Sequence, residues 1–184
     1  MPVKDRYRKF IKTAATATKL IVYSLNDKIY YQMITNETSS VDHYNTLKDI
    51  LGRKYIKSDI ESAFDFIAIA SKGVDAHVID NFKTHFNFPR DFVAELLNIS
   101  SPTIYRWIKA NKVLDRNYSV QLFELTSLFL YGTEVFQSQD NFFKWLNLPN
   151  VAFGQLQPKE LLDIPSGLSK VRDLLGRIEY GVYS

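Results

Sequence analysis

Apolar residues recur at steps of three and four along most of this chain, which is the spacing of amphipathic helices. From residue 41 onward the pattern predicts helices that are separated by short polar turns or by glycine and proline. We expect helices over residues 41–53, 59–71, 75–85, 89–97, 102–111, 119–136 and 139–146, and a last one that begins at residue 165. The predicted fold class is therefore all-α.

The first 57 residues follow a different pattern, and their role is the least readable part of the chain. Residues 1–18 are basic and rich in threonine and alanine, which suits either an arm that contacts phosphates or a solvated chain end. Two β-prone runs, residues 20–23 and 29–34, are separated by Asn26–Asp27 and predict a hairpin. Residues 1–57 are thus expected to be an N-terminal extension of the helical part.

The last predicted helix carries one apolar stripe, with Gly176 inside it, where glycine costs about 1 kcal/mol relative to alanine. The sequence then finishes on an apolar and aromatic end without solvating polar residues. The stripe consists of Leu168, Val171, Leu174, Leu175, Ile178 and Val182. Two explanations stay open: the helix completes the chain's own core, or its end is buried in a partner.

Residues 89–111 have the pattern of two short helices joined by a tight turn. Asn98 lies in the turn, and asparagine is the residue besides glycine that readily accepts a positive φ. Ser101 is the expected N-cap of the second helix, with Pro102 as its first residue.

The second of these helices would bury Ile104 and Ile108, with Trp107 beside them. A polar face would remain for a DNA groove, as in a helix-turn-helix whose second helix enters the major groove. The residues of that face are Ser101, Thr103, Tyr105, Arg106 and Lys109, with Lys112 nearer the phosphates. A plain helical hairpin without DNA binding is the alternative.

Composition excludes several classes of site. The chain has no cysteine, which excludes disulfides, thiolate zinc sites and cysteine nucleophiles. Its three histidines share no metal-binding spacing with a second ligand, and no phosphate-cradling glycine loop is present. We therefore expect no catalysis, no metal and no cofactor. Without a signal-peptide pattern or an apolar run that could span a bilayer, a cytoplasmic location is expected.

The net charge of +3 is unevenly distributed. Residues 1–118 carry eighteen Lys and Arg against thirteen Asp and Glu, whereas residues 119–184 carry five against seven. A basic front part and an acidic back part suggest two partners of different charge, although an asymmetry of this size also arises by chance.

The C-terminal part holds many residues at fixed spacings, in which the chain resembles a known family. The residues are Leu161–Leu162–Asp163, Gly167, Val171, Leu174–Leu175–Gly176–Arg177–Ile178–Glu179 and Gly181–Val182–Tyr183–Ser184. They resemble the C-terminal toxin-binding domain of the Xre/ParS-type antitoxins, the partners of RES-domain toxins in bacterial toxin–antitoxin pairs. The resemblance extends upstream to about Phe64 and includes an Xre-like helix-turn-helix. The chain departs from the family at Arg106–Trp107, where two arginines are frequent, and at Gly154–Gln155, where two glycines are.

The resemblance implies three segments: residues 1–57 as an extension, 58–118 as an Xre-like DNA-binding domain and 119–184 as a toxin-binding domain. It implies a dimeric antitoxin that binds its own operator. It also implies that the chain neutralises a RES-domain toxin, which consumes NAD⁺, by covering the active-site cleft. The toxin-binding residues expected on this basis are Arg177, Glu179, Tyr180, Val182, Tyr183 and Ser184. The runner-up is a stand-alone helix-turn-helix transcription regulator without a toxin partner.

Overall fold

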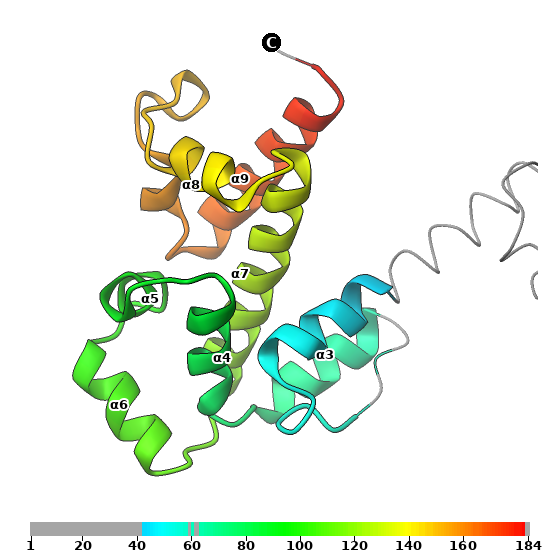
Figure 1. Ribbon diagram of the computed structural model, residues 1–184, viewed down its shortest axis with the longest axis vertical. Coiled ribbons are helices and arrows are strands. Elements are labelled where there is room, and N and C mark those ends of the chain that lie inside the picture. Colours follow the sequence, from blue (N-terminus) through cyan, green and yellow to red (C-terminus); the bar gives the residue numbers. More distant parts are fainter. Residues whose placement is uncertain (1–41, 59, 61–62, 183–184) are drawn as a thin grey trace, which may run out of the picture. The chain divides into compact units, whose positions relative to one another are not determined.

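In the computed structural model of the protein, every described secondary-structure element is helical (Figure 1). The described residues are 42–58, 60 and 63–182, with only the backbone for Ala63, Phe64 and Phe66, and all of them lie in one compact unit, residues 40–184. This confirms the all-α prediction for that part, where an isolated bridge between Asp75 and Val113 is the one β pairing. The predicted arm and hairpin lie outside the described residues.

The helices follow one another with short connections. In chain order they are residues 42–51, α3 (Ala63–Lys72), α4 (His77–His85), α5 (Arg90–Leu96), α6 (Ser101–Lys109), α7 (Arg116–Val135), α8 (Gln139–Leu146), the 3₁₀ turns η1 (Val151–Phe153) and η2 (Pro158–Leu161), and α9 (Pro165–Glu179). No helix in the described part is long and apolar enough to cross a membrane.

Asparagine ends three of these helices. Asn87, Asn98 and Asn111 have φ values of 53°, 51° and 48°, and each follows the last turn of α4, α5 or α6. After α5, the N–H of Asn98 donates to Glu95 O (2.9 Å) and the N–H of Ile99 to Ala94 O (3.0 Å). These are the two hydrogen bonds of a Schellman turn. The tight turn predicted at Asn98 is therefore confirmed.

The helix starts differ from the predictions by a few residues because of capping. Ser100, not Ser101, caps α6: its Oγ accepts from the N–H of Thr103 (3.3 Å), and Ser101 is the first helical residue. Likewise Asp115 caps α7 by accepting from the N–H of Tyr118 (3.3 Å), so α7 begins at Arg116 instead of residue 119.

The core is built around α7, and the side chain of Phe129 is its hub. The ring centroid of Phe129 lies 4.9 to 5.9 Å from those of Phe82, Phe86, Phe88 and Phe142. These rings come from α4, the α4–α5 connection and α8, and most pairs are tilted or edge-to-face, as aromatic pairs prefer. One buried side chain thus holds together the elements on either side of the predicted boundary at residues 118/119, which lies inside α7.

Two glutamines add polar links across the same helix. Gln121 Nε2 donates to Leu96 O at the end of α5 (2.7 Å) and to Asp163 O just before α9 (3.2 Å). Gln139 Nε2 donates to Phe86 O (2.6 Å). The turn after α5 and the entry to α9 are therefore fixed to one another through a single side chain on α7.

The last helix, α9, packs along α7. It buries Leu168, Val171 and Leu175 of the predicted stripe, whereas Val182 lies beyond the helix and is exposed. Gly167 allows the close approach at its start, since a Cβ there would lie 2.0 Å from Leu161 O. Only the first part of the stripe therefore completes the core.

The two glycines of α9 give a matched pair for a stability test. A Cβ at Gly176 would meet nothing closer than the Tyr131 hydroxyl, at 3.6 Å. We expect Gly167→Ala to lower the free energy of unfolding by about 1–3 kcal/mol through the clash. In contrast, Gly176→Ala should raise it by about 0.5–1 kcal/mol through helix propensity. Urea unfolding of both variants tests this, and equal stabilisation by the two would contradict the packing at Gly167.

Candidate functional site

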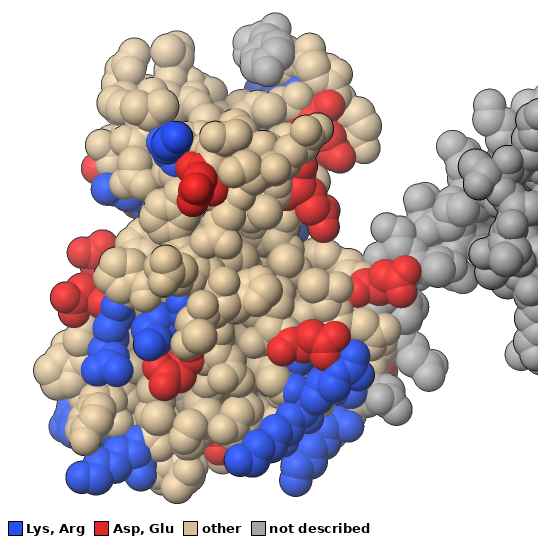
Figure 2. All heavy atoms as spheres, viewed as in Figure 1, with Lys and Arg blue, Asp and Glu red and all other residues tan. Residues whose placement is uncertain are grey.

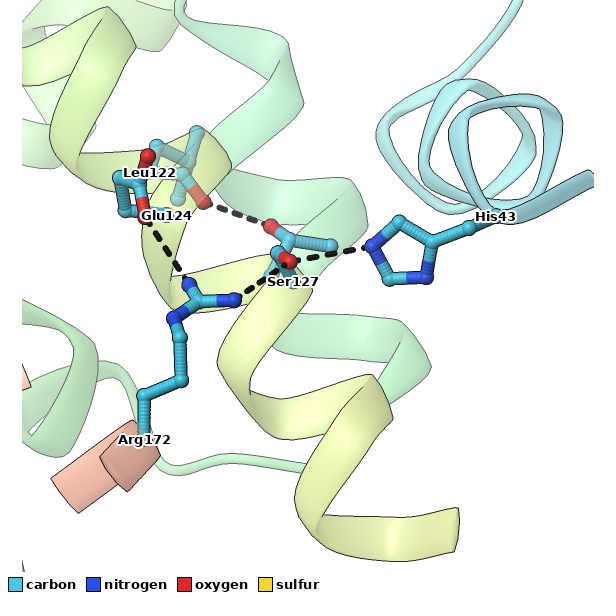
Figure 3. Close-up of polar contacts among 6 residues, drawn as sticks. His43, Leu122, Glu124, Ser127 and Arg172 are labelled. Carbon is cyan, nitrogen blue, oxygen red and sulfur yellow. Dashed lines mark hydrogen bonds and ion pairs between the residues drawn. The ribbon is translucent and has the colours of Figure 1, made fainter. Parts of the chain in front are cut away.

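A polar network on one side of α7 joins three helices (Figure 3). His43, from the helix of residues 42–51, places Nε2 3.0 Å from Ser127 Oγ on α7. From α9, Arg172 donates to the same oxygen through Nη1 (3.3 Å) and to Glu124 Oε2 through Nη2 (2.9 Å). Because Arg172 occupies an acceptor position of Ser127, the hydroxyl hydrogen is free to be donated to a neutral His43. The network fixes α9 to both neighbouring helices.

Beside this network runs a groove of about 630 Å³ between the same three helices. Gly176 and Arg177, both in the block of residues at fixed spacings, line it together with the polar groups just described. The lining residues are His43, Ser127, Tyr131, Glu134, Arg172, Asp173, Gly176 and Arg177. Because Gly176 carries no side chain, the wall of the groove on α9 is open at its centre.

The carboxylate of Glu179, another predicted site residue, is held at the end of α9. Tyr131 on α7 donates its hydroxyl to Glu179 Oε2 (2.6 Å). Burial, together with this carboxylate, raises the pKa of Tyr131 far above its ordinary value of 10. The phenol therefore stays protonated at any physiological pH and keeps Glu179 oriented.

A turn after α9 redirects the chain. The N–H of Gly181, at φ 67°, donates to Ile178 O (3.1 Å), and the N–H of Val182 donates to Arg177 O (2.8 Å). This is a second Schellman turn, and it leaves Tyr180 79% exposed with Val182 exposed beside it. The predicted site residues Tyr183 and Ser184 lie outside the described residues.

The predicted DNA-contacting residues lie on α6 and just after it. Tyr105, Arg106 and Lys109 are exposed, and Arg106 Nη2 donates to Thr103 Oγ1 (3.1 Å). The hydroxyl of Ser101 is engaged, since it donates to the carboxylate of Asp91 on α5. The structure thus brings Thr103 and Arg106 together on α6, leaves Tyr105 exposed on the same helix, and gives Ser101 an acidic partner.

Trp107 belongs to the contact between α6 and α7. Its ring is half-buried, meets the Tyr118 ring edge-on at a centroid distance of 5.0 Å, and has the ammonium group of Lys112 4.0 Å from its centroid. The departure from the family's two arginines therefore replaces a charged residue by a packing residue. Lys112 is exposed but pairs with this ring by a cation–π contact.

Comparison with known proteins connects the C-terminal geometry to a family. Residues 132–181 match the antitoxin Xre/MbcA/ParS C-terminal toxin-binding domain. The chain is also similar to a protein named antitoxin Xre from Photorhabdus laumondii subsp. laumondii, with 22% identity over 118 residues, which cover 64% of this chain and 80% of that protein. These two matches support an Xre-type antitoxin, with a toxin as the partner of its C-terminal domain.

The matched domain begins in the last turn of α7 and ends one residue before Val182. It contains Arg177, Glu179 and Tyr180, and also the whole connection between α8 and α9. Among the described residues no group of three or more His, Asp or Glu is placed to hold a metal ion.

Several residues of the antitoxin's groove were missed by sequence reasoning. Tyr131 reads as one more apolar position of a long helix, and Arg172 as a solvated charge. His43 is 84 residues away from Ser127 in the chain. No local pattern links these residues, since only the packing of α7 against two other helices brings them together.

The pH dependence of stability tests the network of the antitoxin. Burial of His43 lowers its pKa below the ordinary value of 6.5; Glu134 opposes this shift and Arg172 adds to it. The folded state therefore binds fewer protons than the unfolded state near and below pH 6.5, and the free energy of unfolding falls as the pH is lowered through this range.

We expect His43→Gln, which keeps a hydrogen bond to Ser127 but cannot be protonated, to reduce the loss of stability between pH 7.5 and 5.5. Urea unfolding at the two pH values measures this. Burial also lowers the pKa of His85, so His85 adds to the loss of stability at low pH. It is present in both the wild type and the variant, so part of the pH dependence should remain. An unchanged pH dependence in the variant would show that His43 is not the titrating group.

Proposed function

We propose that this antitoxin neutralises a RES-domain toxin, which consumes NAD⁺, by covering the toxin's active-site cleft with the end of α9 and the residues after it. The observation that carries the proposal is the exposure of Tyr180 and Val182 on a turn that is hydrogen-bonded to a rigid, packed helix. Exposed aromatic and apolar side chains on a fixed support are typical of residues that dominate interface energy.

Charged groups surround this apolar end. Arg177 lines the groove beside it, and Glu179 is oriented by Tyr131. A carboxylate held in place here suits pairing with the cationic groups that a dinucleotide-cleaving toxin needs for its substrate phosphates. We include Arg177, Glu179, Tyr180, Val182, Tyr183 and Ser184 in the proposed toxin-binding surface.

We also propose that the antitoxin acts in the cytoplasm and binds its own operator as a dimer through α6. Support comes from the exposure of Tyr105, Arg106 and Lys109 on α6 and of Lys112 just after it, with Thr103 hydrogen-bonded to Arg106. Arginine is the residue that most often reads guanine in the major groove. Because Ser101 is bonded to Asp91, its contribution would require that this hydrogen bond be exchanged.

The two proposed surfaces lie far apart on the described part of the chain. In Figure 1, α6 is at the lower end and the C-terminal turn at the upper end. Figure 2 shows the larger groups of Lys and Arg over the lower half of the visible face. This arrangement suits one antitoxin that holds DNA and toxin at the same time.

Arg106 tests the DNA proposal. Arg106→Ala should weaken operator binding by about 1–3 kcal/mol and relax sequence preference at one base pair. The control Lys170→Ala removes an exposed cation from α9, and operator affinity should not change. If each subunit neutralises about three phosphates, the log–log salt slope of the wild-type dimer should be about −5. Equal affinity of wild type and Arg106→Ala for operator and random DNA would reject Arg106 as a reader.

Removal of residues 180–184 tests the toxin proposal. Tyr180 and Val182 are exposed, so the melting temperature and operator binding should stay close to those of the wild type. Neutralisation should fail, because hot-spot residues contribute about 2–4 kcal/mol each and every 1.4 kcal/mol is tenfold in affinity. The measurement is growth rescue with the toxin induced beside each variant.

A pair of tyrosine variants separates the two activities. Tyr180→Ala should weaken neutralisation only, whereas Tyr105→Ala, which removes a 54% exposed tyrosine from α6, should weaken operator binding only. Full rescue of growth by the truncated chain would exclude the covering mechanism. A parallel fall in melting temperature and both activities would instead assign these residues to the antitoxin's own core.

A further inference from the structure

A second apolar surface lies on the connection between α8 and α9, away from the predicted motif residues. Leu148, Val151 and Leu156 are exposed there, Val151 by 81%. We call residues 147–157 the α8–α9 loop. Although 23% of the chain is charged, residues 145–158 contain no Lys, Arg, Asp or Glu. A contiguous uncharged and apolar surface of this kind on a globular protein marks an interaction site.

Hydrogen bonds give the α8–α9 loop a defined conformation, and Asn150 makes several of them. The N–H of Asn150 donates to Leu156 O (3.0 Å), its carbonyl accepts from Gln155 N (2.9 Å), and its Oδ1 accepts from Ala152 N (2.9 Å). Gly154, at φ 64°, makes the reversal between them. These bonds hold the apolar side chains outward before any partner arrives, which lowers the entropic cost of binding.

The loop is packed on the domain at its middle, and its two ends are joined by a hydrogen bond. Phe153 packs partly buried against the core, and Lys159 Nζ donates to Asn147 Oδ1 (2.8 Å). In Figure 1 the loop extends toward the same end of the described part as the turn after α9. The loop and the C-terminal turn therefore lie at the same end of the domain.

We propose that the α8–α9 loop is a second toxin-contacting surface, whose residues Leu148, Val151 and Leu156 dock on an apolar part of the toxin's surface outside the cleft that the C-terminal residues cover. This inference rests on the proposed function, since it assumes that the domain binds a toxin. The loop lies entirely inside residues 132–181, the segment that matches the toxin-binding domain.

A second copy of the chain is the other candidate occupant, and the size of the surface argues against it. A stable interface usually buries at least about 1,200 Å², with 20–30 residues on each side. Three side chains on one loop supply a small fraction of this. They suit an extension of a larger interface, such as one that already includes the end of α9.

The test uses the full-length antitoxin and the protein encoded by the neighbouring gene, with binding measured by isothermal titration calorimetry. Val151→Asp should raise the Kd at least tenfold, because it places a carboxylate without a partner in an apolar contact. The matched control is Val113→Asp, at a valine that is 60% exposed and follows α6; its Kd should stay within twofold of the wild type. Both variants should keep the wild-type melting temperature, and Val151→Asp should also keep the wild-type operator affinity.

The outcomes separate this inference from the proposed function. If the wild-type chain does not bind the neighbouring gene's product, the proposed function fails, and the inference with it. If the wild type binds and Val151→Asp binds equally well, only the inference fails. A change in molar mass by light scattering, with toxin affinity unchanged, would assign the loop to self-association and overturn the inference. In a chain that lacks residues 180–184, Val151→Asp should weaken the remaining binding further, because separate contacts act additively.

Discussion

The packing of aromatic rings around Phe129 is the interaction on which the rest of the described structure depends. Phe129 lies near the middle of α7, and its ring contacts those of Phe82 and Phe88 on one side and Phe142 on another. Close-packed interiors tolerate little change in volume, so a helix fixed at this point fixes its neighbours as well. Both proposed binding surfaces of the antitoxin are carried by elements that pack on α7 or on its neighbours.

This shared core would allow a small protein to present the two proposed binding surfaces. Gln121 bonds to the carbonyl of Leu96 at the end of α5 and to that of Asp163 before α9. The network of His43, Ser127 and Arg172 fixes α9 on its other side. Buried or half-buried hydrogen bonds of this kind specify one arrangement of the helices, because breaking any of them leaves a polar group without its partner.

Two of the places where the described part exposes apolar side chains lie in the matched domain. Tyr180 and Val182 are exposed after α9, and Val151 is exposed on the α8–α9 loop. In both places the backbone is hydrogen-bonded into a defined turn. Exposed apolar side chains on fixed turns add little to the stability of the isolated chain. We therefore infer that they contact a partner. Gly176 is a similar case. A Cβ at this position would have room in the fold, so a contact with a partner would explain why the residue is glycine.

The sequence by itself determined the approximate positions of the helices and the resemblance to the antitoxin family. Both depend on local periodicity and on motifs of fixed spacing. The all-α class, the turn at Asn98 and the bounds of α8 follow from residues close together in the chain. Tertiary structure decided everything that depends on contacts between distant residues. It placed Trp107 against Tyr118, the hydroxyl of Tyr131 on Glu179, and His43 beside Ser127. It also gave the hydroxyl of Ser101 a partner on the preceding helix, the carboxylate of Asp91. Local patterns fix which residues form a helix, whereas the packing of one helix on another decides which of their polar groups meet.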